Sequence, residues 1–178
     1  MRSGRRRGRH RGARARRPLS AATRTPLLLS GGPPRPYRGA VAHRNDPDVI
    51  ARLLLQPGRW AVVGLSQNTA RTAYGIAAYL QTLGKPIVPV HPRAEEVHGA
   101  RGYARLADVP GPIDVVDVFV NSRRAGQVVD DAIAVGARAV WLQLGVVDED
   151  AAARASAAGL DVVMDTCPAI EAPRLGLR

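Results

Sequence analysis

A loop of small and polar residues follows the first strongly apolar run of the sequence. It reads Gly64-Leu65-Ser66-Gln67-Asn68-Thr69 and separates an expected strand from an expected helix. Gly64 permits a tight turn, Ser66 and Asn68 offer polar groups, and the helix start presents unpaired backbone N–H groups. The pattern predicts an anion-binding turn. A purely structural turn is the alternative, because Ser66 and Thr69 replace two glycines of the dinucleotide-binding G-x-G-x-x-G pattern.

A second candidate loop, Val90-His91-Pro92-Arg93, follows the next apolar run. Enzymes that bind NAD usually carry an Asp or Glu near this point to hold the ribose hydroxyls. The chain has no acidic residue between Gly64 and Arg93, and His91 and Arg93 suit a phosphate group instead. The loop therefore argues against plain NAD. A solvated His91 without a ligand is the alternative interpretation.

A third candidate loop, Phe119-Val120-Asn121, comes at the end of a long apolar run and before an expected helix. Asn121 or Ser122 is a good N-cap, which would explain either residue without any ligand. Arg123 and Arg124 follow directly, although cations oppose the dipole at a helix start. This conflict favours an anionic ligand or partner for one of the two. An ordinary solvated helix start is the alternative.

No group of side chains in the sequence predicts catalysis. Cys167 is the only cysteine, has no histidine near it in sequence, and is expected to be a buried apolar residue. Asp114 and Asp117 lie in one expected strand, on opposite faces, so they form no carboxylate pair. The four histidines lack the spacing of a metal site. We therefore expect a protein that binds rather than one that catalyses.

The elements that must position these loops alternate between strand and helix. Apolar runs predict strands near 60–64, 86–90, 113–120, 137–144 and 161–165, with a short extra strand near Gly102-Tyr103. Helical spacing and terminal glycines predict helices near 70–83, 123–135 and 148–158, and Asn45-Asp46-Pro47-Asp48 begins an earlier one. Such alternation predicts a doubly wound, Rossmann-like α/β fold with a mostly parallel five-stranded sheet and helices on both faces.

The charge of the chain is concentrated at its N-terminus. Residues 1–44 hold 13 of the 26 basic residues and no acidic one, which leaves 13 basic residues against 15 acidic ones, a net of −2, in residues 45–178. Rich in Arg, Gly and Pro and without periodicity, the first segment is expected to be a disordered tail. A nucleic-acid or membrane-phosphate arm, a targeting peptide and translation from a misplaced start codon remain open explanations.

Composition also bounds the class of protein. With one cysteine no intramolecular disulfide can form, which fits the cytoplasm, and no apolar run is long enough to span a membrane. Twenty-five arginines against a single lysine, Lys85, indicate a GC-rich bacterial genome. The 45–178 segment is expected to fold as one domain, in an oligomeric state that the sequence leaves open.

Short motifs occur in a characteristic order over nearly all of residues 45–175. They are Trp60-Ala61-Val62-Val63-Gly64-Leu65-Ser66, Ala70-Arg71-Thr72-Ala73-Tyr74-Gly75, Pro89-Val90-His91-Pro92, Asp114-Val115-Val116-Asp117-Val118-Phe119, Val140-Trp141-Leu142-Gln143 with Gly145-Val146, and Val163-Met164-Asp165 with Cys167 and Ile170-Glu171. In this order the motifs resemble those of the small stand-alone bacterial CoA-binding domain proteins.

The resemblance implies a Rossmann-like fold similar to the CoA-binding domain of succinyl-CoA ligase α subunits, and coenzyme A or an acyl-CoA as the small nucleotide-type ligand. The ligase's phosphohistidine domain has no counterpart in the sequence, so no ligase chemistry is expected. Arg93 and Arg71 would contact phosphates. By resemblance the pyrophosphate would meet Gly64, Ser66, Gln67 and Asn68, the adenosine would meet His91, Pro92 and Arg93, and the pantetheine or ribose side would meet Phe119, Val120 and Asn121.

The sequence departs from the family's pattern at several positions. Thr72 replaces a usual proline, Val120 a usual arginine and Leu144 a usual glutamate, while Ala169 and Ala172 replace polar or basic residues. Such losses favour one alternative, a degenerate Rossmann module acting in protein–protein regulation. A second alternative, an NADP- or FAD-dependent enzyme, is disfavoured by the broken glycine pattern and the missing ribose acid.

Overall fold

The computed structural model describes residues 42–177, so the predictions for the basic N-terminal segment fall almost wholly outside the described residues. Within the described part, five parallel strands form one sheet in the order β2-β1-β3-β4-β5. The strands are β1 (Trp60–Val63), β2 (Ile87–Val90), β3 (Val115–Val118), β4 (Ala139–Leu142) and β5 (Asp161–Val163). The predicted five-stranded, doubly wound α/β fold is therefore confirmed.

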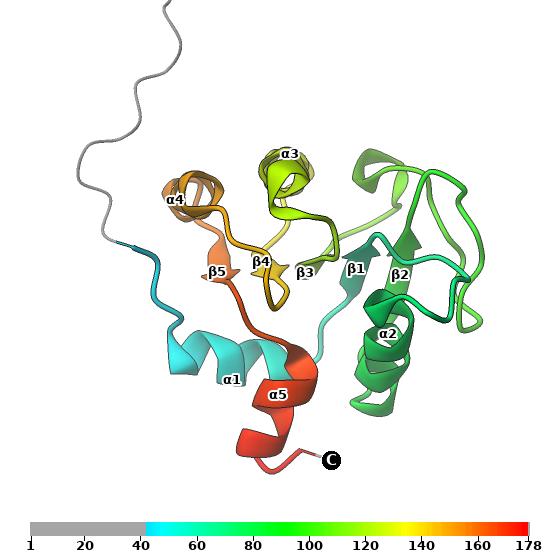
Figure 1. The fold of residues 1–178 in the computed structure, drawn as a ribbon, viewed down its shortest axis with the longest axis horizontal. Coiled ribbons are helices and arrows are strands. Elements are labelled where there is room, and N and C mark those ends of the chain that lie inside the picture. The colour runs from blue at the N-terminus through cyan, green and yellow to red at the C-terminus, as the bar shows by residue number, and fades with distance from the viewer. Residues whose placement is uncertain (1–41, 178) are drawn as a thin grey trace, which may run out of the picture. The chain divides into compact units, whose positions relative to one another are not determined.

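Helices cover both faces of the sheet (Figure 1). The α-helices are α1 (Pro47–Leu55), α2 (Thr72–Thr82), α3 (Ser122–Ala134), α4 (Glu149–Ala157) and α5 (Pro168–Arg174). Helices α3 and α4 lie on one face, and α1, α2 and α5 lie on the other. Among residues 42–177, no helix combines the length and the apolar character that crossing a membrane would require.

Burial on both sides explains why the strands are apolar runs rather than alternating patterns. Every residue of β2, β3 and β4 is buried. On the face covered by α1, α2 and α5, the rings of Trp60 and Trp141 pack with their centroids 5.6 Å apart. The opposite face packs Val116, Val118 and Val140 against α3 and α4. A core on each face holds the strand ends rigidly in place.

The chain direction across the sheet reverses between β1 and β3. From β1 the chain moves outward to β2, and it then returns to the other side of β1 to form β3, β4 and β5. In open α/β sheets, ligands bind beyond the carboxyl ends of the strands at such a reversal. The fold therefore puts the candidate site at the ends of β1 and β3.

Some predicted elements differ from the observed ones. The strand expected near Gly102-Tyr103 is wrong, because Tyr103 forms only an isolated bridge with Val90. Helix α5 and a 3₁₀ turn at Leu106–Asp108 were not predicted. A proline at the first turn of a helix is a known start signal, and Pro168 occupies that position in α5.

The first described residues attach to the body of the domain. The backbone N–H of His43 donates to Glu149 at 2.7 Å. Asn45 makes two hydrogen bonds to the backbone of Met164, at 2.7 and 2.8 Å, directly after β5. The N-cap of α1 is Asp46, whose carboxylate accepts from the N–H of Asp48. Asn45 therefore ties the chain to the sheet, and its neighbour caps the helix.

Candidate functional site

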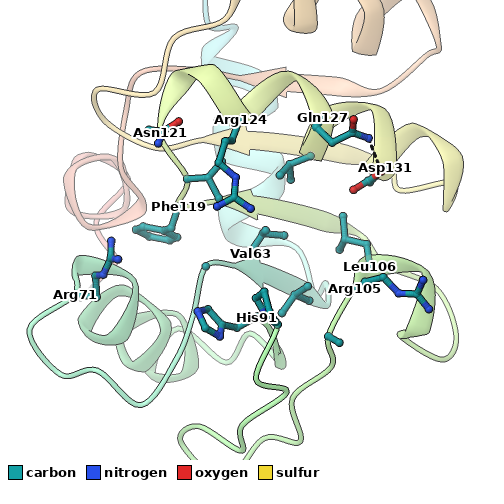
Figure 2. Close-up of a pocket in the computed structure, with 16 residues that line it drawn as sticks. Val63, Arg71, His91, Arg105, Leu106, Phe119, Asn121, Arg124, Gln127 and Asp131 are labelled. Atoms are coloured by element: carbon teal, nitrogen blue, oxygen red, sulfur yellow. Dashed lines mark hydrogen bonds between the residues drawn. The ribbon is translucent and has the colours of Figure 1, made fainter.

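A pocket of about 500 Å³ opens at the carboxyl ends of β1 and β3, beneath α3 (Figure 2). This volume is within the range of small-molecule sites. Its wall comes from the strand ends, the start of α2, one face of α3 and two loops. The lining residues are Val63, Gly64, Arg71, Val90, His91, Pro92, Ala104, Arg105, Leu106, Phe119, Val120, Asn121, Arg124, Gln127, Val128 and Asp131.

Gly64 forms the turn that leads from β1 into the floor of the pocket. Its φ is +100°, a backbone conformation that favours glycine, and a Cβ here would lie 2.8 Å from the backbone oxygen of Phe119. Its N–H donates to Val90 at 2.8 Å. The glycine is required because the ends of β1 and β3 approach each other so closely.

Two guanidinium groups face the pocket without a carboxylate partner among the described residues. They belong to Arg71, at the start of α2, and Arg124, in the first turn of α3. Arg105 also lines the pocket, but it is held by Asp108 at 2.7 and 3.0 Å, a contact that lowers the pKa of that carboxyl. The pocket therefore presents Arg71 and Arg124 as cations available to an anionic ligand.

The N-termini of two helices, α2 and α3, lie at the pocket. Arg71 is the N-cap residue of α2 and Asn121 that of α3, and neither side chain makes a capping hydrogen bond. Helices α1 and α4, by contrast, are capped by the carboxylates of Asp46 and Asp148. Asn121 thus occupies the predicted N-cap position, but its side chain does not cap the helix. The uncapped ends expose backbone N–H groups and a partial positive charge at the pocket.

Seven of the eleven residues singled out from the sequence line the pocket. Residues that lie 57 positions apart in the chain are thereby brought together at one edge of the sheet. The seven are Gly64, Arg71, His91, Pro92, Phe119, Val120 and Asn121. Arg124 also lines the pocket. It is one of the two arginines at the start of α3 for which the sequence predicted an anionic ligand or partner, and the other, Arg123, does not line the pocket.

The remaining four residues, Ser66, Gln67, Asn68 and Arg93, lie outside the pocket wall. Ser66 is buried, and its Oγ accepts from the N–H of Asn68 at 3.4 Å. The Asn68 side chain turns back to accept from Ala70 at 3.1 Å. These contacts are internal to the loop, so a ligand role for Ser66 and Asn68 stays a prediction.

A segment after β2, residues 93–96, contacts the polar loop at Gln67, although residues 67–70 of the loop stay exposed. The Gln67 N–H donates to a Glu95 carboxylate oxygen at 3.1 Å, and its side chain donates to the backbone oxygen of Glu96 at 3.0 Å. Arg93 pairs with the same Glu95 carboxylate at 3.4 Å. The chain's own carboxylate thus lies against the loop where the resemblance implies a pyrophosphate.

Sequence reasoning missed the wall that α3 supplies. Arg124, Gln127, Val128 and Asp131 lie at i, i+3, i+4 and i+7, the spacing of one helix face. A helix that starts at the strand-end residue Asn121 must turn one such face towards the site, so this spacing was a usable signal. Ala104, Arg105 and Leu106 had none, because a tertiary bridge between Tyr103 and Val90 places them.

Two buried groups of the kinds that can act in catalysis, Cys167 and Asp117, lie outside the wall of this pocket. Cys167 is buried, and burial raises the pKa of its thiol. Asp117, in β3, is fully buried, and desolvation raises its pKa to about 8, although a hydrogen bond from Gln143 at 2.6 Å opposes that rise. Within residues 42–177, no three His, Cys, Asp or Glu side chains are grouped so as to hold a metal ion.

Comparison with known proteins adds evidence independent of this geometry. The uncharacterized protein YneT of Bacillus subtilis (strain 168) is 35% identical over 118 residues, which cover 66% of this chain and 87% of YneT. A hypothetical protein from Pyrococcus horikoshii OT3 has a similar structure, with a TM-score of 0.69 and 34% identity over 75% of this chain and 96% of that one.

A larger enzyme contains a similar domain. The dinucleotide-forming acetyl-coenzyme A synthetase 1 of Ca. Korarchaeum cryptofilum matches with a TM-score of 0.57 and 25% identity, over 64% of this chain but only 27% of the synthetase. The family model described as CoA binding domain matches residues 58–173, a span that contains every residue of the pocket wall. The chain is therefore a member of the CoA binding domain family.

Proposed function

We propose that the protein binds coenzyme A or an acyl-CoA in the pocket at the ends of β1 and β3, and that it does so without catalysing a reaction on it. One observation carries the proposal: two uncapped helix N-termini and two unpartnered guanidinium groups converge on that pocket. The residues concerned are Arg71 at the N-terminus of α2, and Asn121 and Arg124 at the N-terminus of α3. The two helices follow β1 and β3, between which the strand order reverses.

The arrangement suits phosphate groups for reasons of charge. A helix N-terminus favours an anion through its dipole and its free N–H groups. A hydrogen bond to a charged group contributes about 1.5–3 kcal/mol, and guanidinium matches the geometry of phosphate oxygens. Arg71 and Arg124 carry no competing carboxylate among the described residues, so a ligand phosphate would not have to displace one.

The choice of coenzyme A over a nicotinamide cofactor rests on the loop after β2. In the NAD-binding variant of this fold, an acidic residue at that strand end holds the ribose hydroxyls. Here β2 ends in Val90 and is followed by His91 and Pro92, both in the pocket wall. Membership of the CoA binding domain family supports the same choice.

The composition of the wall supports binding rather than catalysis. Among its described residues there is no thiol, hydroxyl or amine that could act as a nucleophile, and the titratable side chains besides arginine are His91 and Asp131. Pro92, Phe119 and Val120 add apolar surface at the phosphate end. Such a wall can hold a nucleotide and leave its thiol or thioester unchanged.

Isothermal titration of the purified protein with coenzyme A, dephospho-CoA, NAD, NADP and FAD tests this proposal. Binding of coenzyme A with at least tenfold preference over the nicotinamide and flavin cofactors is expected. Tighter binding of NADP or FAD would favour the enzyme alternative. Absence of binding by any of the five would favour a degenerate module that acts through other proteins.

A further inference from the structure

The two ends of the pocket differ in charge. At one end lie Arg71, His91 and the start of α3 with Arg124. At the other end the cation Arg105 is already paired with Asp108, and Asp131 adds a carboxylate to the wall. A ligand that fits both ends therefore needs negative charge at one end and hydrogen-bond donors at the other.

The carboxylate of Asp131 has one oxygen free to accept a hydrogen bond from a ligand. Its Oδ1 accepts from Gln127 Nε2 at 3.0 Å, the contact drawn in Figure 2. No cation pairs with it among the described residues, so its second oxygen keeps its acceptor capacity. The Gln127 donor also favours one orientation of this exposed carboxylate on the helix face.

The spacing of this carboxylate from the cation suits a nucleoside. Arg124 and Asp131 are seven residues apart on one face of α3, which is about 10 Å at 1.5 Å per residue. Between the two ends the wall is apolar, with Leu106 and Val128 both buried among the core residues of this sheet face. A flat heteroaromatic ring can lie against those side chains while its edge reaches Asp131.

We infer that Asp131, oriented by Gln127, determines which base the pocket accepts, by accepting a hydrogen bond from an exocyclic amino group. This assignment rests on the proposed function and deepens it. It puts the base beside α3 rather than beside His91, Pro92 and Arg93, where the resemblance implies the adenosine. Adenine presents an amino group at its six position, whereas hypoxanthine presents a carbonyl oxygen there. That oxygen repels a carboxylate oxygen in the same place, and hypoxanthine can recover a hydrogen bond to Asp131 only by shifting so that its N1–H donates, which costs fit.

Titrations with ADP and inosine diphosphate measure the discrimination directly, because the two ligands share their phosphates and ribose. Wild-type protein is expected to bind ADP about 10- to 100-fold more tightly, the usual range for one well-placed hydrogen-bonding pair. In Asp131→Asn the ratio is expected to fall towards one or to reverse, because an amide can donate to the hypoxanthine oxygen.

Asp130→Asn is the matched control. Asp130 is the adjacent residue, but it pairs with Arg154 of α4 at 2.8 Å and does not line the pocket. This variant loses the same charge and is expected to keep the wild-type ratio. Equal affinity of wild-type protein for ADP and inosine diphosphate, or the same ratio in both variants, overturns the assignment of Asp131 alone. Failure of wild-type protein to bind either ADP or coenzyme A overturns the proposed function as well.

Discussion

The carboxyl group of Asp117 is fully buried within the sheet and is shielded from water. It lies in β3 with Val62 of β1 and Trp141 of β4 as its partners in the register. Oδ1 accepts from Gln143, and Oδ2 has no hydrogen-bond partner among the described residues. Burial without a second partner disfavours the charged form, which is why the pKa rises to about 8.

This raised pKa predicts the sign of a pH effect on stability. The unfolded carboxyl ionises near pH 4 and the folded one only near pH 8, so the unfolded chain is favoured increasingly between those values. The contribution of Asp117 to the free energy of unfolding is therefore greatest below pH 4. It falls by about 1.4 kcal/mol per pH unit up to about pH 8 and is constant above that.

Asp117→Asn is expected to remove this slope, because asparagine keeps the acceptor for Gln143 and has no proton to lose. At pH 8 the variant should exceed wild type by several kcal/mol in the free energy of unfolding, and near pH 4 the two should be similar. Urea unfolding at several pH values measures both curves. Parallel curves for the two proteins would show that Asp117 is not protonated in the folded state.

At the scale of elements, the segment 93–96 lies against the polar loop after β1. Its position depends on Gly102, where a Cβ would lie 2.0 Å from the backbone oxygen of Glu95. Glu95 accepts the Gln67 N–H, and its charge lies beside the loop. A ligand phosphate that approaches this loop would therefore be repelled by Glu95.

Glu95→Gln is expected to strengthen coenzyme A binding several-fold, because it removes that repulsion while a side-chain oxygen can still accept from Gln67. Glu96→Gln is the control, since Glu96 contacts the loop through its backbone oxygen. Titration calorimetry of both variants measures the change. Weaker binding in Glu95→Gln would mean that the carboxylate holds the loop in its binding conformation.

The segment 93–96 is a part of the candidate site whose position could not be predicted from the sequence. Strand and helix positions followed from apolar runs and terminal glycines, and each of the three strand-end loops contributes residues to one pocket. Gly64 was predicted to permit a tight turn, and its φ of +100°, a conformation that favours glycine, agrees. The contacts of Glu95 with Gln67 and Arg93 were not foreseeable. They depend on how residues 91–103 fold back, and no local periodicity encodes that path.

At the scale of the whole molecule, the net charge is a poor guide to the site. The chain carries +11 overall, but residues 45–178 carry −2, and most surface arginines outside the pocket pair with nearby carboxylates, as Arg52, Arg138 and Arg154 do. The cations at Arg71 and Arg124 are distinguished by their place, at the reversal of strand order and beside two helix N-termini without side-chain caps.

Calorimetric titration of coenzyme A into wild-type protein, Arg124→Ala and Arg123→Ala tests the central claim most directly. The two arginines are adjacent in α3 and both exposed, but only Arg124 lines the pocket. The Arg124→Ala variant is expected to bind coenzyme A about 10- to 100-fold more weakly, because it loses one charge-assisted contact. Arg123→Ala should bind about as well as wild type. Equal affinities of the two variants would contradict the placement of the ligand phosphates in this pocket.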